Sequence, residues 1–267
     1  MKSKLIYVAL CVFIFACNPK QDKTKNSSDK LLTAVLWYQH SAEMTALYYQ
    51  GFNIAKMRLN EAIANNQQEK PLAVVVDIDE TMLNNSPYET SLLKNPDSLQ
   101  EWYQWTAKSS AKALPGALEF AKYAESKNVK IFYITNRDDK ERAATLKNLV
   151  NVGFPYADED HLLTRSDLSY STGNTSSKEG RRIKVSQKNN IVLLLGDNLN
   201  DFSQYFEDRS KNDGKDSVAK YKELFGQKFI VLPNPIYGAW EKPLYNYNDT
   251  LSDDAKTRLM KSKLITE

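Results

Sequence analysis

Val74-Val-Val-Asp-Ile-Asp-Glu-Thr81 is the stretch that decides the fold of this 267-residue chain. Its apolar run is typical of a strand buried on both faces, as in a parallel sheet. Asp77 and Asp79 follow at the carboxyl end of that strand, where open α/β sheets place their ligands. Two crowded carboxylates repel each other unless a cation joins them or one takes a proton. Because Mg²⁺ prefers hard oxygen ligands, we hypothesise a metal-assisted phosphoryl-transfer site here.

The rest of the chain alternates between predicted strands and helices. Further strands are expected at 130–135, 191–195 and 228–232. Helices are expected at 31–65, 115–126, 138–151, 178–187 and 252–263. Such alternation predicts an α/β fold with a doubly wound parallel sheet.

One segment, 83–113, interrupts the alternation directly after the two aspartates. Long insertions at such a place often form a lid or a binding wall over a site. We therefore expect a small, mainly helical cap at 83–113 inside a single domain. That domain is predicted to comprise an N-terminal helical segment at 31–70, an α/β core at 71–82 and 114–250, and a C-terminal helix within 251–267.

The first seventeen residues differ from the rest. Two lysines precede an apolar run at 5–16, and the run ends at Cys17. This pattern predicts a secretory signal peptide, because the apolar run is too short for a permanent transmembrane helix. Ile14-Phe-Ala-Cys17 resembles a bacterial lipobox, which implies lipidation of Cys17; a plain signal peptide with a coincidental cysteine is the alternative.

Cysteine usage agrees with export. The chain has two cysteines, and Cys11 lies inside the segment to be removed, so the mature chain keeps Cys17 alone. Residues 18–30 are rich in Lys, Asn, Ser and Asp, which predicts a flexible tether between membrane and domain. We expect an exported, membrane-anchored lipoprotein of the bacterial outer membrane, on its periplasmic face or at the cell surface.

The overall composition limits the class of partner. Hydrophobic residues make up 42% of the chain and charged residues 26%, as in an ordinary globular protein. The formal net charge is only +3, and the lysines are scattered among acidic residues. This balance predicts a solvated surface and gives no argument for binding a nucleic acid polymer.

Reactive residues cluster near the ends of the predicted strands. Asp77 and Asp79 follow the first strand, Thr135, Asn136 and Arg137 the second, and Asp197 and Asp201 the third, while Lys178 opens the helix before the third. This order resembles the haloacid dehalogenase (HAD) superfamily. The closer matches, to class C acid phosphatases of the outer-membrane lipoprotein e type, are Asp77-Ile-Asp-Glu-Thr-Met-Leu-Asn-Asn-Ser-Pro-Tyr88, Ala113-Leu-Pro-Gly-Ala117, Ile134-Thr-Asn-Arg137, Gly196-Asp-Asn-Leu-Asn-Asp-Phe202 and Pro233-Asn-Pro-Ile-Tyr-Gly-Ala-Trp240.

The resemblance implies a role for each carboxylate. Asp77 would attack phosphorus and form an acyl phosphate, while Asp79 would act as general acid and then general base. Mg²⁺ would be bound by the side chains of Asp77 and Asp197 and by the backbone carbonyl of Asp79. Asp201 would hold the waters of the metal, with capping or solvent exposure as its alternative. Glu80 is expected to be structural.

The remaining polar residues would bind the phosphate. Thr135 and Lys178 would contact its free oxygens and stabilise charge in the transition state. Lys178 is preferred to Lys184 because Lys178-Glu-Gly-Arg181 matches a Lys-x-x-Arg motif of the family. Asn136 and Arg137 are predicted to bind substrate, and structuring of their loop is the alternative.

Aromatic residues would form a wall for the leaving group. The candidates are Tyr88, Trp102, Trp105 and Tyr237, with Trp240 beside them. Stacking on a base or nicotinamide ring contributes about 1–3 kcal/mol and tolerates many ring types. Core packing is the alternative for each, and Tyr237 is favoured because Pro and Gly flank it.

The resemblance thus implies a Mg²⁺-dependent acid phosphatase, a phosphoric monoester hydrolase acting on nucleoside 5′-monophosphates including nicotinamide mononucleotide. Two alternatives stay open. A phosphotransferase would share the acyl phosphate on Asp77, and a non-catalytic surface binding lipoprotein could retain the same fold. The resemblance also suggests a homodimer.

Overall fold

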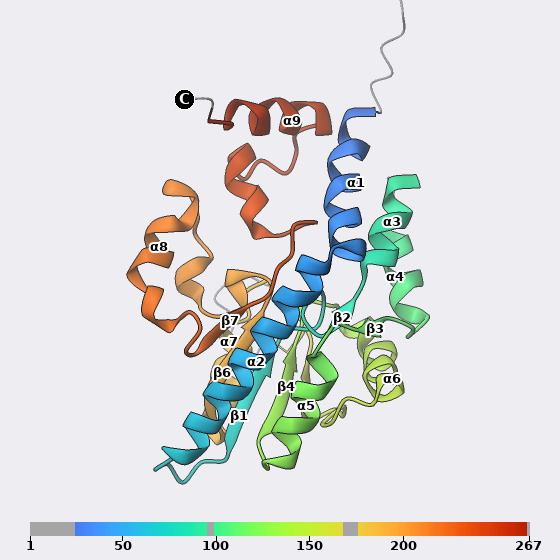
Figure 1. Ribbon diagram of the computed structural model, residues 1–267. Helices are drawn as coiled ribbons and strands as arrows, with labels where there is room; N and C mark the ends of the chain where they lie inside the picture. The colour runs from blue at the N-terminus through green and yellow to red at the C-terminus, as the bar shows by residue number, and fades with distance from the viewer. Residues whose placement is uncertain (1–24, 95–98, 168–175, 266–267) are drawn as a thin grey trace, which may run out of the picture.

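The fold is built on a five-stranded parallel sheet, which lies behind α2 (Ala42–Ala64) in Figure 1, in a computed structural model that describes residues 25–94, 99–167 and 176–265. The strands are β1 (Leu72–Val76), β4 (Lys130–Ile134), β5 (Leu162–Leu163), β6 (Asn190–Gly196) and β7 (Phe229–Val231). Their order is β5-β4-β1-β6-β7, so the predicted doubly wound parallel sheet is confirmed. Sequence reading missed β5, because two leucines between polar loops give no recognisable apolar run.

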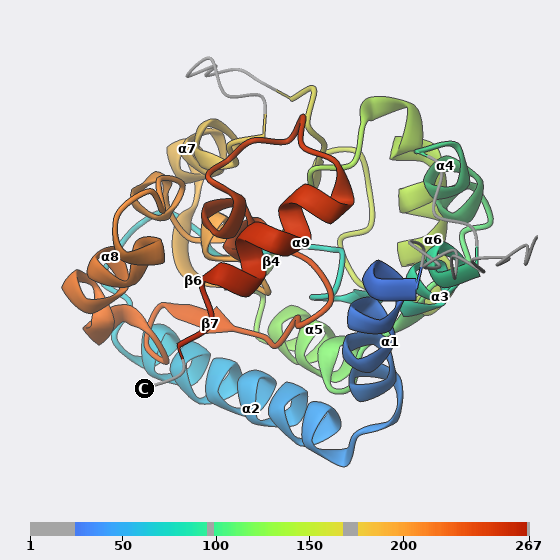
Figure 2. The same cartoon turned by 90° about the horizontal axis from the view of Figure 1, so that it is seen from above.

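Helices cover both faces of the sheet (Figures 1 and 2). On one face α2 (Ala42–Ala64) and α5 (Ala117–Ser126) pack on Val74 and Val76. On the other face α7 (Glu179–Lys188) and a group of phenylalanines pack on Ala73 and Val75. Successive side chains of a strand point to opposite faces, so every residue of β1 is buried.

The chain order creates a crevice at the centre of the sheet. From β1 the chain proceeds to β4 and β5 on one side, then returns to β6 and β7 on the other. Ligands of open α/β sheets bind where the chain reverses in this way, at the carboxyl ends of the strands. Here that place lies between the ends of β1 and β6.

The predicted helix at 31–65 is in fact two helices, α1 (Lys25–His40) and α2. Ser41 breaks them apart: its extended backbone ends α1, and its hydroxyl accepts a bond from the amide of Met44 at 3.0 Å, capping α2. Helix α1 begins at Lys25, inside the segment 18–30 that was predicted to be a tether. The predicted signal peptide and Cys17 lie outside the described residues.

The segment at 83–113 stands beside the carboxyl ends of the strands. Strands β2 (Leu83–Asn84) and β3 (Lys112–Ala113) pair antiparallel and bring its two ends together. Between them lie α3 (Ser86–Lys94) and α4 (Leu99–Ala107). Helix α1 lies against α3 (Figure 2).

The other elements connect the strands. Gly116 caps α5 with a φ of +80°, so Pro115 lies before that helix rather than in its first turn. Asp138 caps the turn before α6 (Arg142–Val152), which ends at Gly153. The remaining helices are α8 (Lys215–Lys220), α9 (Asp253–Ser262) and the 3₁₀ helices η1 (Asp139–Glu141), η2 (Leu199–Asp201), η3 (Gln204–Phe206), η4 (Asn212–Gly214), η5 (Lys222–Leu224) and η6 (Ala239–Tyr245).

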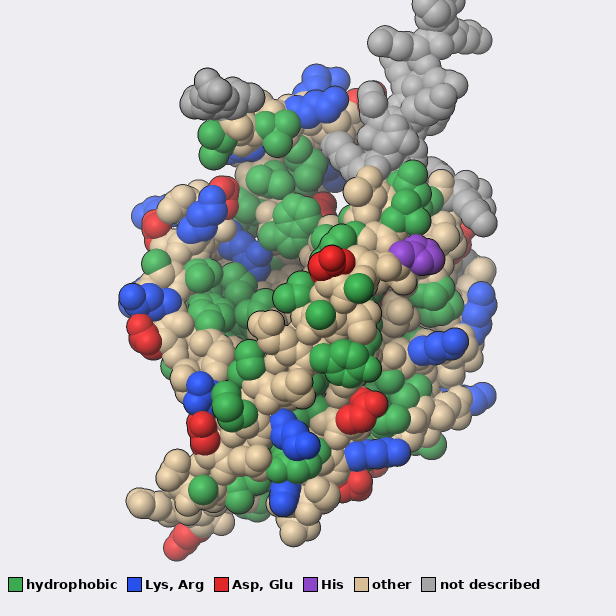
Figure 3. Space-filling model, viewed as in Figure 1, with side chains coloured by type: hydrophobic (Ala, Val, Ile, Leu, Met, Phe, Trp, Pro, Cys, Tyr) green, Lys and Arg blue, Asp and Glu red, His purple; other side chains and the backbone are tan. Residues whose placement is uncertain are grey.

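A shallow groove separates α2 from the edge strand β7. Leu47, Ile54 and Phe229 are among its lining residues. Figure 3 views the face that carries α2 and shows hydrophobic side chains gathered over this part of the molecule. Within the described residues, no helix combines the length and the apolar character needed to cross a membrane.

Candidate active site

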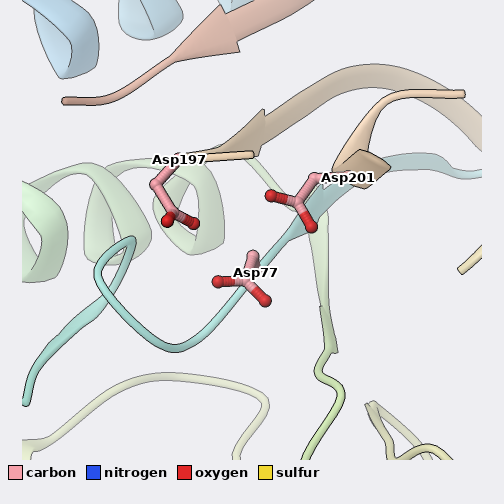
Figure 4. Close-up of side chains that lie close together, drawn as sticks. All are labelled: Asp77, Asp197 and Asp201. Carbon is pink, nitrogen blue, oxygen red and sulfur yellow. The ribbon is translucent and has the colours of Figure 1, made fainter. Parts of the chain in front are cut away.

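Three aspartates converge in the crevice between β1 and β6. Asp77 follows β1, Asp197 follows β6, and Asp201 lies in η2. One carboxylate oxygen from each residue lies within 4.8 Å of the other two, and in the described part of the chain this is the acidic group close enough to hold a metal ion. Figure 4 shows the three side chains pointing toward one another. The sequence predicted this convergence from the strand ends.

A tight turn brings Asp201 back toward Asp197. The turn is a 3₁₀ helix, and Asp201 Oδ2 accepts a bond from the amide of Asn198 at 3.0 Å. A Cβ at position 196 would overlap the Asp201 carboxylate. Gly196 is therefore required for the close approach of this carboxylate to the end of β6.

Lys178 is the cation that contacts this cluster. It caps the start of α7, and its buried ammonium donates to Asp77 and, at 2.6 Å, to Asp201. Lys184, the alternative weighed from the sequence, is exposed. Behind Lys178, the fully buried Arg181 donates to the carbonyls of Thr135 and Ser177, which joins the two loops on either side of the site.

The charges of the cluster favour a bound cation. Burial raises the pKa of Asp77 to about 7, although Lys178 opposes the shift. Burial and the neighbouring Asp77 and Asp201 raise the pKa of Asp197. Burial lowers the pKa of Lys178, but the Asp201 and Asp77 carboxylates outweigh it, so Lys178 stays charged. One ammonium for three carboxylates leaves negative charge on hard oxygen donors, and this donor set fits a divalent ion such as Mg²⁺.

The carboxylate of Asp79 lies apart from this cluster. Oδ1 accepts bonds from Arg137 Nη2 at 2.7 Å and from Asn85 Nδ2 at 2.8 Å. Oδ2 accepts bonds from Arg137 Nε at 3.2 Å and from the Thr135 hydroxyl at 3.3 Å. Both oxygens of the Asp79 side chain are thus occupied by hydrogen bonds from the protein. A metal contact of Asp79 through its backbone carbonyl is compatible with this arrangement.

The side chains of the loop after β4 are hydrogen-bonded to neighbouring residues. Arg137 is buried and also donates to the Thr145 hydroxyl at 3.0 Å. Asn136 Oδ1 accepts a bond from Arg181 at 2.6 Å, and its Nδ2 donates to the carbonyl of Ser176 at 3.0 Å. These contacts correspond to the loop-structuring alternative for Asn136 and Arg137.

Comparison with known proteins identifies the family. Residues 13–240 match the family described as HAD superfamily, subfamily IIIB (acid phosphatase). The chain belongs to this family. The fold predicted from the family resemblance is confirmed as well.

Solved structures extend the likeness to acid phosphatases of class C. The class C acid phosphatase from Bacillus anthracis superposes with a TM-score of 0.82 at 42% identity, covering 90% of this chain and 98% of that one. A second structure of that acid phosphatase, with tungstate bound, matches equally well. Acid phosphatase 1 from Solanum lycopersicum is 31% identical over 130 residues. That match covers 48% of this chain and 50% of the tomato protein, so the chain spans about half the length of this curated relative.

In this chain the predicted aromatic wall has two kinds of members. Tyr88 and Trp102 pack edge to face, with ring centroids 5.0 Å apart, and both stay partly exposed. Trp105 instead donates its indole N–H to Asn85 Oδ1 at 2.8 Å. Tyr237, the residue favoured from its sequence context, donates its hydroxyl to Glu80. Trp105 and Tyr237 thus hold the segment that follows Asp79 by their polar groups.

Glu80 is the centre of a buried clamp. Its φ of +57° places it in the left-handed region, which is strained for a residue with a side chain. Its carboxylate accepts the Tyr237 hydroxyl and, at 2.7 Å, the amide of Asn85. Its carbonyl accepts the Tyr48 hydroxyl at 2.5 Å, and that hydroxyl also contacts the Tyr38 hydroxyl at 2.5 Å. The structural role expected for Glu80 is thus a clamp on the backbone that follows Asp79.

Sequence reasoning missed three residues that touch the aspartates. Asn234 Nδ2 donates to Asp197 Oδ2 at 2.8 Å, and the Thr81 hydroxyl donates to Asp197 Oδ1 at 3.3 Å. Asn85 contacts Asp79, as described above. All three lie within the quoted motifs, so the signal was present, but nothing in the spacing indicated which motif residue faces which carboxylate.

Proposed function

We propose that this chain is a Mg²⁺-dependent acid phosphatase that hydrolyses phosphomonoesters through an aspartyl-phosphate on Asp77. The observation that carries the proposal is the buried group of Asp77, Asp197 and Asp201 with Lys178, next to a separately held Asp79. This arrangement supports Asp77 as the nucleophile and the three aspartates as the group around the metal ion. It leaves the Asp79 carboxylate outside that group.

The first step transfers the phosphoryl group to the protein. The Asp77 carboxylate attacks phosphorus and forms an acyl phosphate, while the bond from phosphorus to the ester oxygen breaks. Asp79 gives its proton to the departing oxygen, so the alcohol leaves neutral. Lys178, which contacts Asp77, and the Thr135 hydroxyl, which contacts Asp79, would hold the other phosphoryl oxygens.

The second step returns the protein to its starting state. Asp79, now ionised, takes a proton from water, and that water attacks phosphorus. The bond between phosphorus and Asp77 breaks and releases inorganic phosphate. Bound by Asp77, Asp197 and the Asp79 carbonyl, with Asp201 holding its waters, Mg²⁺ would supply positive charge that offsets the crowding of carboxylates and phosphate. The tungstate bound by the relative from Bacillus anthracis supports an oxyanion site, because tungstate is a tetrahedral oxyanion like phosphate.

The substrate we propose is a nucleoside 5′-monophosphate, including nicotinamide mononucleotide. Support comes from Tyr88 and Trp102, which are partly exposed, pack on each other and belong to the segment beside the site. Ring stacking suits a range of bases. The test of this substrate class is to compare kcat/KM for several nucleoside monophosphates with kcat/KM for glycerol phosphate, which has no ring. Equal values would contradict stacking of the base on Tyr88 and Trp102.

We further propose that Cys17 carries lipid and anchors the enzyme to the outer membrane, and that the enzyme forms a homodimer. The support for the anchor is the basic start, apolar run and cysteine of residues 1–17. Metabolic labelling with palmitate in the native host tests the anchor, with Cys17→Ser as the control; an unlabelled wild type contradicts it. Sedimentation of the purified protein tests the dimer.

Metal removal is the main test of the proposed function. We expect a chelator to abolish phosphate release from the purified protein and added Mg²⁺ to restore it, because the carboxylate cluster then regains its counter-charge. Phosphate release is measured with and without chelator, and circular dichroism checks that the fold survives. Full activity after complete chelation would contradict the metal role.

A further inference from the structure

Asn85 connects the general acid to cap helix α4. Its Nδ2 donates to Asp79 Oδ1 at 2.8 Å, and its Oδ1 accepts the indole N–H of Trp105 at 2.8 Å. An indole nitrogen is a donor only. Trp105 therefore fixes the orientation of the amide, so that the Asn85 oxygen faces α4 and its NH₂ group faces Asp79.

Loss of the indole N–H would remove this constraint. With Trp105 unable to donate, the Asn85 oxygen loses its hydrogen-bond donor, and the amide that donates to Asp79 is no longer anchored to α4. Asn85 is fully buried, so no bulk water replaces the lost donor. The orientation of Asp79 thus depends on a side chain in the cap.

Arg137 makes a second connection between Asp79 and the same helix. Its guanidinium contacts both oxygens of Asp79 and lies 5.5 Å from the ring of Trp102. Tyr103, between the two tryptophans, donates its hydroxyl to Asp138 Oδ2 at 2.6 Å. Helix α4 is therefore fastened to the loop that carries Arg137 as well as to Asn85.

We propose that Trp105 is a positioning residue that acts through Asn85, and that Arg137 is its counterpart on the other side of the Asp79 carboxylate. Together they aim Asp79 at the oxygen of the leaving group. The cap helix α4 thereby sets the efficiency of proton donation in addition to lining the site. This inference rests on the proposed function, in which Asp79 protonates that oxygen.

The proposal predicts an effect that depends on the leaving group. An alkoxide needs a proton in order to leave, whereas 4-nitrophenolate is a stable anion that leaves without one. A misplaced Asp79 should therefore slow the hydrolysis of alkyl phosphates and leave the hydrolysis of 4-nitrophenyl phosphate nearly unchanged. The ratio kcat/KM reports steps only through the departure of the leaving group, so the later hydrolysis of the acyl phosphate does not enter the comparison.

The test is Trp105→Phe in the full chain with Mg²⁺, which keeps an aromatic ring and removes the N–H. We expect kcat/KM for an alkyl phosphate to fall about 10- to 100-fold, part of the usual contribution of general acid catalysis, and that for 4-nitrophenyl phosphate to fall less than about threefold. Trp37→Phe is the matched control, because Trp37 is a partly buried tryptophan of α1 that packs against the hydrophobic core, and it should change neither value.

Arg137→Lys tests the other side and covers the case in which Trp105→Phe does not fold. Lysine keeps the charge and loses the planar fork, so the same selective loss is expected. Equal losses for both substrates, or no loss for either, would overturn the proposal. A wild type that releases no phosphate from either substrate would instead refute the proposed function, so the two failures are distinguishable.

Discussion

The two sides of the site are built in opposite ways. On the strand side, Asp77, Asp197 and Asp201 point into one crevice, and their crowding is opposed by Lys178. On the wall side, Trp105 of α4 donates its indole N–H to Asn85. Tyr237, which follows β7, donates its hydroxyl to Glu80. Residues at strand ends are placed by the sheet itself, whereas the wall residues depend on partners distant in sequence.

The strand side should be the more sensitive to a small change. We expect Asp77→Asn to lower phosphate release by about 10⁴-fold or more, because an amide does not attack phosphorus and the reaction loses its covalent route. The measurement is turnover of 4-nitrophenyl phosphate with Mg²⁺ present.

A matched surface variant controls for the loss of a negative charge. Asp208 is exposed and follows η3, so Asp208→Asn should keep normal turnover. If Asp77→Asn retained a tenth or more of the activity, the nucleophile would have to be another residue.

The wall side should respond through stability. We expect Tyr237→Phe to lower the free energy of unfolding by about 1–3 kcal/mol, because the buried Glu80 carboxyl loses a hydrogen-bond partner while the ring is kept. Urea unfolding provides the measurement, and turnover should fall as the clamp behind Asp79 loosens.

Tyr49→Phe gives the matched comparison, since Tyr49 is 49% exposed. Should Tyr237→Phe leave both unfolding and turnover unchanged, Tyr237 would act by its ring alone, as a stacking surface. That result would contradict the claim that the wall residues are held by hydrogen bonds to distant partners.

A change in stability that is confined to high pH is expected in α3. Burial, with a contribution from Glu241, raises the pKa of Glu89 in α3 from 4.5 to about 7. The folded state therefore binds this proton more tightly than the unfolded state. The resulting stability is fully present below pH 4.5 and is lost as the pH rises to about 7.

Glu89→Gln removes this dependence because glutamine stays neutral. At pH 8 we expect the variant to be more stable than the wild type by about 1–3 kcal/mol, and near pH 4 to differ little. Thermal unfolding at the two pH values measures the difference. An equal shift at both pH values would show that Glu89 does not titrate in this window.

The sequence predicted the parts of the molecule that follow from local order. Apolar runs ending in aspartates gave the central strands and the converging carboxylates, because parallel strands bring their carboxyl ends to one edge. The break at Ser41 was missed because the apolar spacing continues across it. The placement of Asn85, Asn234 and Arg137 depends on tertiary contacts, for which a single sequence holds no spacing rule.

The hydrogen bond between the Tyr38 and Tyr48 hydroxyls links α1 and α2 to the segment after Asp79, so both helices belong to the folded unit. A shorter chain that started at Pro71, just before the sheet, would keep Asp77, Asp79, Asp197 and Asp201. It would also leave the carbonyl of Glu80 without the Tyr48 hydroxyl and expose the sheet face that α2 covers. The smallest piece of this enzyme worth producing for crystallisation or assay therefore starts at α1, well before its first reactive residue.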